Sequence, residues 1–136
     1  MNYQNLDQVR AKNAIKYKDT EFPGADGGEV VKKVPMLIRD NGILAAAAFA
    51  AERKSNGRDL KNSGHELVFK CIIEHLADGN IKRLNNVMDL DKFIEHLSDT
   101  DSAFLRDITA ESMNYLNYLR RFARKKGDSD NANRSK

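Results

Sequence analysis

Nine consecutive residues, Ile43 to Ala51, are apolar, and six of them are alanine. A strand of this length would need several β-branched side chains, whereas alanine is the best helix former. The run therefore predicts a central helix that is apolar on every side and buried. Because alanine side chains are small, neighbouring helices can approach closely, and we expect at least one of Ala47 and Ala48 to be tightly packed. The run is about half as long as a membrane-spanning helix needs to be, so no membrane segment is expected.

Apolar residues elsewhere recur mostly at helical spacing, and only Pro23 and Pro35 interrupt the chain. A chain of 136 residues fits one domain, and the pattern predicts an all-α fold, a compact single-domain bundle of about six helices. Residues 1–126 should form the helical domain. Residues 127–136 carry no apolar side chain larger than alanine and should be a disordered polar tail. The expected helices are 2–18, 29–36 (with Pro35 bending it or dividing it from the next segment), 43–51, 67–77, 89 or 91 to 97, and 102–126.

Polar residues mark several of the expected helix starts. Ser63 and Glu66 have the spacing of a capping box, which would open the helix at 67–77. The carboxylates of Asp89 or Asp91 and of Asp101 should cap the last two helices. Calcium binding by these carboxylates is a remote alternative, because the spacing of a calcium loop is absent.

The single cysteine, Cys71, excludes an intramolecular disulfide and a cysteine-based zinc cage. Its neighbours at helical spacing are Val68, Ile72 and Leu76, so it should be a small core residue. The N-terminus lacks the basic and apolar stretches of a secretory signal. A cytoplasmic location with a reduced thiol is therefore expected.

Catalytic patterns are not found. Each of the three histidines, His65, His75 and His96, is adjacent to a glutamate, and adjacent residues on a helix point about 100° apart. No second histidine lies three or four residues away, so we expect solvated or helix-edge histidines and no metal. The glycine-bearing loop at 24–28 follows no strand and lacks the lysine that ends a phosphate loop. We therefore predict that the chain is not an enzyme and does not bind a cofactor.

Positive charge is concentrated near the C-terminus. The net charge is only +3, but residues 120–126 contain five lysines and arginines, and no acidic residue lies between Ser112 and Lys126. On the last expected helix, the face opposite the core carries Arg106, Asn117, Arg120, Arg121 and Arg124. A solvated charged surface is one interpretation, and binding of backbone phosphates by the arginine forks is the other. The further candidates for RNA contact are Lys12, Lys16, Arg39, Lys82 and Arg83.

Two polar residues of the first expected helix, Arg10 and Asn13, fall on its apolar face. Lys12 and Lys16 point away from that face. Polar groups are tolerated inside a protein when they are hydrogen-bonded or paired. Arg10 and Asn13 should therefore be buried, bonded groups that determine how this helix packs.

Three sequence motifs resemble a known family. They are QVRAKNA at 8–14, KVPMLIRDNGILAAA at 33–47 and YLNYLRRFA at 115–123. Their order and spacing closely resemble the small-subunit family of the type III-B CRISPR effector, the fifth subunit of the Cmr complex, over about residues 3 to 126. Tyr118 departs from the pattern, because tryptophan is more common there, but the change keeps an aromatic side chain.

The resemblance implies a six-helix bundle that joins a ribonucleoprotein carrying a CRISPR RNA. Its partners would be the backbone and large subunits of the Cmr complex, neighbouring copies of itself and the CRISPR RNA–target RNA duplex. Because a backbone subunit cuts the target in that family, a non-catalytic structural small subunit acting in antiviral defence is expected. The alternative is a free-standing helical regulator that binds nucleic acid, which would need an exposed recognition helix and usually a dimer interface.

Overall fold

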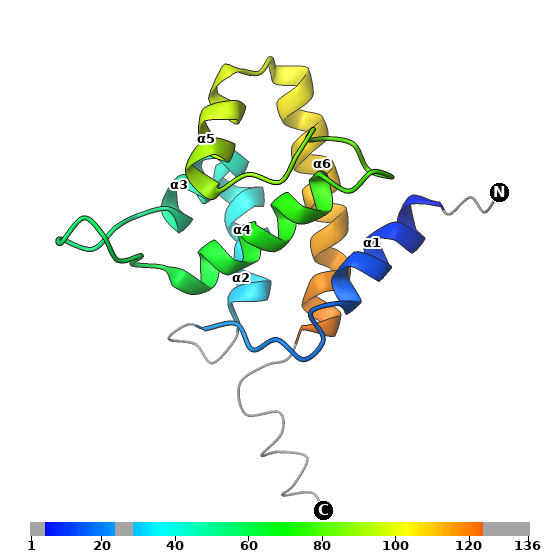
Figure 1. Ribbon diagram of the computed structural model, residues 1–136, viewed down its shortest axis with the longest axis horizontal. Helices are drawn as coiled ribbons and strands as arrows, with labels where there is room; N and C mark the ends of the chain where they lie inside the picture. Colours follow the sequence, from blue (N-terminus) through cyan, green and yellow to red (C-terminus); the bar gives the residue numbers. More distant parts are fainter. Residues whose placement is uncertain (1–4, 24–28, 124–136) are drawn as a thin grey trace, which may run out of the picture.

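The computed structural model describes residues 5–23 and 29–123. These ranges contain six helices and no sheet, which confirms the predicted all-α fold. An isolated bridge between Arg53 and Leu60 closes the turn that projects from the bundle between the third and fourth helices (Figure 1). The helices are α1 Leu6–Ile15, α2 Val30–Asn41, α3 Ile43–Ala50, α4 Ser63–Leu76, α5 Leu90–Asp99 and α6 Ser102–Phe122.

Helix α4 lies at the centre of the bundle, where it contacts α2, α3, α5 and α6. Seen as in Figure 1, it runs across the front of α2 and α6, while α1 packs against α6 on one side. The buried side of α4 includes Val68, Phe69, Ile72 and Leu76, none of which is exposed to solvent. This arrangement leaves α2 and α6 in contact with each other on the reverse face of the molecule. No helix in the described ranges is long and apolar enough to cross a membrane.

The alanine-rich helix α3 is buried on one side only. Ala46, Ala47 and Ala50 are fully buried, which confirms the predicted tight packing of at least one alanine. Ala48 and Phe49, by contrast, are exposed, so the prediction of a helix buried on every side is wrong. The reason is its position: α3 packs on α2, α4 and α5, and no described element covers its remaining face.

Pro35 does not divide α2 from the segment that follows, so that alternative of the prediction is wrong. The helix continues from Val30 to Asn41 with Pro35 inside it. Proline removes one backbone hydrogen bond, but buried Val34 and Ile38 hold the helix to the core on both sides of it. The chain turns instead at Gly42, whose φ of 89° favours glycine and whose N–H bonds to the Ile38 carbonyl at 2.8 Å.

Aspartates begin the last two helices as predicted. The side chain of Asp89 accepts a hydrogen bond from the Lys92 backbone N–H, and that of Asp101 accepts one from the Phe104 N–H, both at 2.8 Å. Helix α6 ends at Phe122 rather than at residue 126. The predicted tail at 127–136 lies outside the described residues.

The capping box predicted at Ser63 is wrong. Ser63 is already the first residue of α4, and Asn62 is the N-cap without a side-chain capping bond. The Asn62 amide instead donates to the carbonyl oxygen of Phe49 at 2.9 Å, which ties the end of the projecting turn to α3. A contact between segments thus replaces the local cap.

Candidate nucleic-acid interface

A groove of about 460 Å³ lies between α2 and α6. Helix α2 contributes one charged residue near each end of its exposed face, and α6 contributes a cation near its C-terminus. No acidic side chain of the described residues lines it. The lining residues are Lys32, Pro35, Met36 and Arg39 from α2, with Met113, Asn114, Leu116, Asn117 and Arg120 from α6.

Helical periodicity explains why these side chains share one groove. On α2, Lys32, Met36 and Arg39 follow one another at spacings of four and three residues, so they lie along one face of the helix. The other face carries the buried residues Val34 and Ile38, which pack into the core. The amphipathic pattern of α2 therefore places Lys32, Met36 and Arg39 away from the core, and the packing of α2 against α6 puts them on the groove.

The α6 side of the groove follows the same rule. Met113, Asn117 and Arg120 are spaced four and three residues apart on the solvent side of the helix. Tyr115 and Leu119 are buried on its other side. Because α6 packs against α2, Arg120 lies on the same groove as Arg39.

The three cations of the groove, Lys32, Arg39 and Arg120, are suited to bind anionic ligands. Arg120 has no hydrogen bond or ion pair with any residue that the structure describes. Arg39 Nε lies 3.4 Å from Asp40 Oδ1, and Lys32 Nζ lies 3.5 Å from Glu29 Oε2. Ion pairs between exposed side chains contribute at most about 1 kcal/mol. A phosphate could therefore replace the Asp40 carboxylate at Arg39 at little cost.

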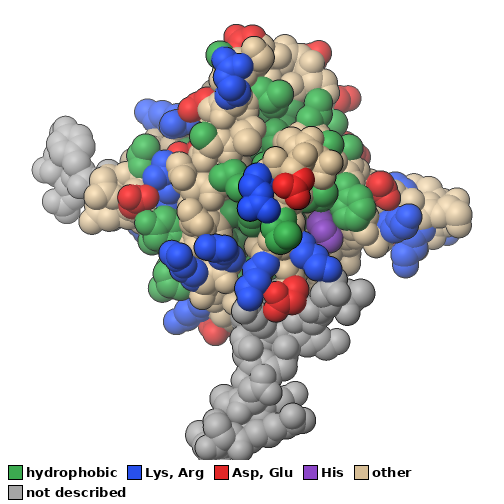
Figure 2. Space-filling model, turned by 180° about the vertical axis from the view of Figure 1, so that it is seen from behind, with side chains coloured by type: hydrophobic (Ala, Val, Ile, Leu, Met, Phe, Trp, Pro, Cys, Tyr) green, Lys and Arg blue, Asp and Glu red, His purple; other side chains and the backbone are tan. Residues whose placement is uncertain are grey.

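The reverse view of the molecule looks onto α2 and α6. Figure 2 shows several Lys and Arg side chains across the lower half of this face, beside exposed hydrophobic side chains. A few Asp and Glu side chains lie among them (Figure 2), but clustered positive charge attracts polyanions even when the net charge is small. The face that carries the groove thus has a surface suited to nucleic acid.

The remaining sequence-predicted cations do not line this groove. Arg106 is exposed on α6 but precedes Arg120 by about 21 Å along the helix axis, given a rise of 1.5 Å per residue. Arg121 is exposed on α6 beside the groove, and Lys12 and Lys16 are exposed on α1, as predicted. Arg124 lies outside the described residues.

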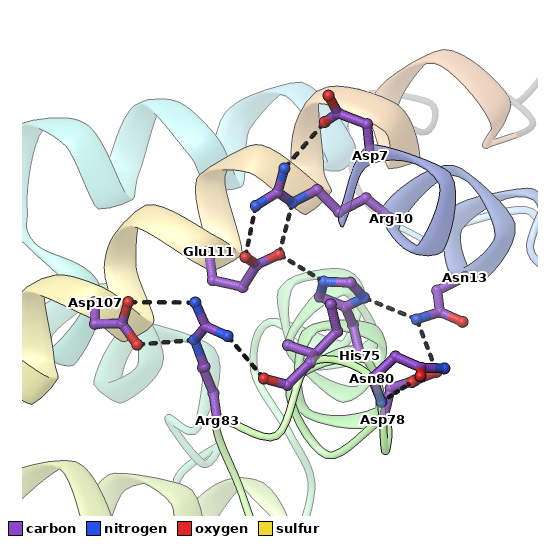
Figure 3. Close-up of polar contacts among 10 residues, drawn as sticks. Asp7, Arg10, Asn13, His75, Asp78, Asn80, Arg83, Asp107 and Glu111 are labelled. Atoms are coloured by element: carbon purple, nitrogen blue, oxygen red, sulfur yellow. Dashed lines mark hydrogen bonds and ion pairs between the residues drawn. The ribbon is translucent and has the colours of Figure 1, made fainter. Parts of the chain in front are cut away.

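The loop after α4 holds the last two candidates, and they differ from each other. Lys82 is exposed. Arg83, by contrast, is tied down: its Nε donates to Asp107 at 2.8 Å and its Nη1 donates to the Ile81 carbonyl at 2.7 Å (Figure 3). Arg83 is partly buried and its donors already have a carboxylate and a carbonyl partner, so it has fewer donors left for a phosphate. Sequence reasoning did not identify Lys32 as a candidate for RNA contact. No local pattern distinguishes it from other lysines, and only the packing of α2 against α6 places it on the groove with Arg120.

A buried polar network joins α1 to α6 (Figure 3). The Arg10 guanidinium donates to both Glu111 oxygens, with Nη2–Oε1 at 2.7 Å and Nε–Oε2 at 2.8 Å. Its Nη1 also donates to Asp7 at 3.0 Å. The prediction of buried, bonded groups is confirmed for Asn13, whose amide nitrogen donates to His75 and to Asp78. Arg10 is bonded as predicted but only partly buried, with 11% of its side chain exposed.

His75 is buried, so the prediction of solvated or helix-edge histidines is wrong for this residue. Its Nδ1 lies 2.9 Å from Asn13 Nδ2, and its Nε2 lies 2.9 Å from Glu111 Oε2. Since the Asn13 amide nitrogen can only donate, Nδ1 must accept and Nε2–H must donate, which requires neutral imidazole. The ring also stacks on Tyr115, with 4.3 Å between ring centroids.

The pKa values of the network are explained by these contacts. Burial lowers the pKa of His75, although the hydrogen bond to Glu111 opposes this effect. Burial also tends to raise the pKa of Glu111, but hydrogen bonds from Arg10 and His75 outweigh it and hold that pKa below its usual value. Glu111 is therefore ionised and His75 neutral near pH 7. The network holds helices together and leaves no free acid–base pair.

Cys71 is buried in the core, as predicted. Burial raises the pKa of its thiol to about 12, so little reactive thiolate is present near neutral pH. Nearby, the Tyr17 hydroxyl donates to Glu74. Within the described ranges, no three His, Cys, Asp or Glu side chains are grouped so that they could hold a metal ion.

The fold and the groove together define a small all-helical bundle that carries a groove lined by three cations. The chain belongs to the family described as CRISPR-associated protein (Cas_Cmr5), whose model matches residues 6–126. It is thus a CRISPR-associated Cmr subunit of the small-subunit family, and the resemblance carried by the three motifs is confirmed. Searches of the curated proteins and of the solved structures give no match.

Proposed function

We propose that this chain is a non-catalytic structural small subunit of the type III-B Cmr ribonucleoprotein, and that it helps to hold target RNA through the α2–α6 groove. The observation that carries the proposal is the convergence of Lys32, Arg39 and Arg120 on one groove that no described acidic side chain lines. Membership of the Cas_Cmr5 family supports a place in a Cmr complex.

The chemistry of the groove suits backbone phosphates. Arginine presents a planar fork of donors that matches phosphate oxygens, and lysine adds a compact charge. Contacts to phosphate position a nucleic acid without reading its sequence. This suits an RNA-guided complex, in which base pairing with the guide selects the target.

Assembly with other subunits needs a second kind of surface, and the open side of α3 is our candidate for it. Ala45, Ala48 and Phe49 are exposed there, and small alanine side chains permit close approach of a partner helix. Contiguous exposed apolar surface commonly marks protein contacts. We assign this side to the backbone or large subunit, or to a neighbouring copy of the chain.

The test compares assembled complexes that carry Arg39→Ala or Arg120→Ala with the parent complex. We expect normal incorporation, weaker target-RNA binding for all sequences, and a salt slope lower by about one unit for each phosphate that the variant no longer binds. Arg106→Ala is the matched control, since it removes an exposed arginine of α6 outside the groove. Incorporation with an unchanged salt slope in both groove variants would contradict the proposal. Failure of the subunit to incorporate would assign these arginines to a protein interface.

A further inference from the structure

The floor of the α2–α6 groove is apolar, which phosphate binding alone does not require. Pro35, Met36, Met113 and Leu116 lie between the cations. Met36 is 51% exposed, on the side of α2 opposite its buried face. A ligand with a flat apolar part would cover this floor.

Amide side chains supply polar contacts beside the floor. Asn114 and Asn117 are exposed on α6, line the groove and form no hydrogen bond with any described residue. An asparagine amide both donates and accepts, so it can pair with the mixed donors and acceptors on the edge of a nucleobase. The groove therefore combines an apolar floor, adaptable hydrogen-bonding groups and cations.

We infer that the groove receives an unpaired nucleobase of single-stranded RNA, which packs on Met36 and Met113 while Arg39 and Arg120 hold the flanking phosphates. This inference rests on the proposed RNA-binding function, and it specifies which part of the RNA the groove binds. A groove of about 460 Å³ falls within the usual range of small-ligand sites, about 300–1,000 Å³.

The chemistry favours an unpaired base over a duplex. In A-form RNA the base faces are stacked on one another, so a protein reaches mainly phosphates and 2′-hydroxyls. A single-stranded segment exposes the face of each base to an apolar platform. Methionine suits a platform of this kind, because its flexible thioether adapts to different rings and attracts aromatic faces. Binding should therefore depend on the presence of a base more than on its identity.

The experiment uses the full chain labelled with ¹³C at its methionine methyl groups, titrated with a hexamer of uridine. Bases stacked on the floor should shift the Met36 and Met113 signals through their ring currents. Met88 lines a separate hollow between α4 and the segment before α5, so its signal is the internal control. An abasic hexamer with the same phosphates should leave all three signals nearly unchanged.

A variant measurement complements the titration. Met36→Ala and Met113→Ala should weaken binding of the uridine hexamer by about two- to tenfold, the range expected for sulfur–aromatic contacts, and leave the salt slope unchanged. Met88→Ala should bind like the parent. Because Met36 is half exposed, its replacement should not unfold the chain.

The outcomes separate this inference from the proposed function. If Arg39→Ala and Arg120→Ala lower the salt slope while Met36 and Met113 respond equally to the abasic and uridine hexamers, the groove binds phosphate only and the inference is wrong. If neither arginine nor methionine substitutions matter, both proposals fail. A response of the two methionines to a purified partner subunit, but not to RNA, would also overturn the inference and assign the groove to protein contact.

Discussion

Replacing Glu111 by leucine tests whether the buried network holds α1 on α6. The Glu111 side chain is only 2% exposed and accepts hydrogen bonds from Arg10 Nε, Arg10 Nη2 and His75 Nε2. The substitution removes the shared acceptor but adds a side chain of similar size, so little cavity forms. The Arg10 charge and the His75 N–H would then be left without their acceptor.

The magnitude depends on the partner that Arg10 keeps. Removing one partner of a buried ion pair costs about 3–5 kcal/mol. The Arg10 side chain is 11% exposed and keeps Asp7 at 3.0 Å, which places the cost at the lower end, about 3 kcal/mol. With an m-value of about 1–3 kcal/mol/M, the urea midpoint of unfolding should fall by about 1–3 M.

Urea denaturation followed by circular dichroism at pH 7 measures this loss, and a double-mutant cycle isolates the pair. Arg10→Met combined with Glu111→Leu removes both charges, so the double variant should be more stable than the sum of the single losses predicts. We expect a coupling free energy of at least about 1 kcal/mol. A Glu111→Leu protein within about 1 kcal/mol of the parent, or strictly additive losses, would refute the role assigned to the network.

Three further predictions concern the core. Burial lowers the pKa of His75 below the unfolded value of about 6.5, so only the unfolded chain gains that proton as pH falls below 6.5. The free energy of unfolding should therefore decline from pH 7 to pH 5.5. Urea titrations should show a flatter decline for His75→Gln. Ala47→Leu should overpack a fully buried site and cost about 1–3 kcal/mol, whereas Ala48→Leu, at an exposed position of the same helix, should melt close to the parent. Gly64→Ala should lower the melting temperature although alanine favours helices, since its Cβ would lie 1.8 Å from the Pro23 carbonyl oxygen; a rise would contradict the packing described.

Local patterns along the chain predicted the elements of the fold well. The alanine run forms α3, and Asp89 and Asp101 cap helices because a short side chain reaches backbone N–H groups only two or three residues away. The apolar face of the first helix correctly placed Arg10 and Asn13 on its packed side. These features depend on neighbours within one or two helical turns, and such neighbours are also close in the sequence.

Contacts between distant segments decided the rest. Arg10 and its acceptor Glu111 are 101 residues apart, and no local spacing identifies Glu111 as the partner. His75 is buried rather than solvated because α1, α4 and α6 meet at its ring, so its charge state depends on side chains from all three helices. Arg39 and Arg120 each look like an ordinary exposed cation, and they share a groove only because α2 packs beside α6. Periodicity determines which face of a helix is polar, but the closest partner of that face depends on how the whole core packs, and that is a property of the folded chain.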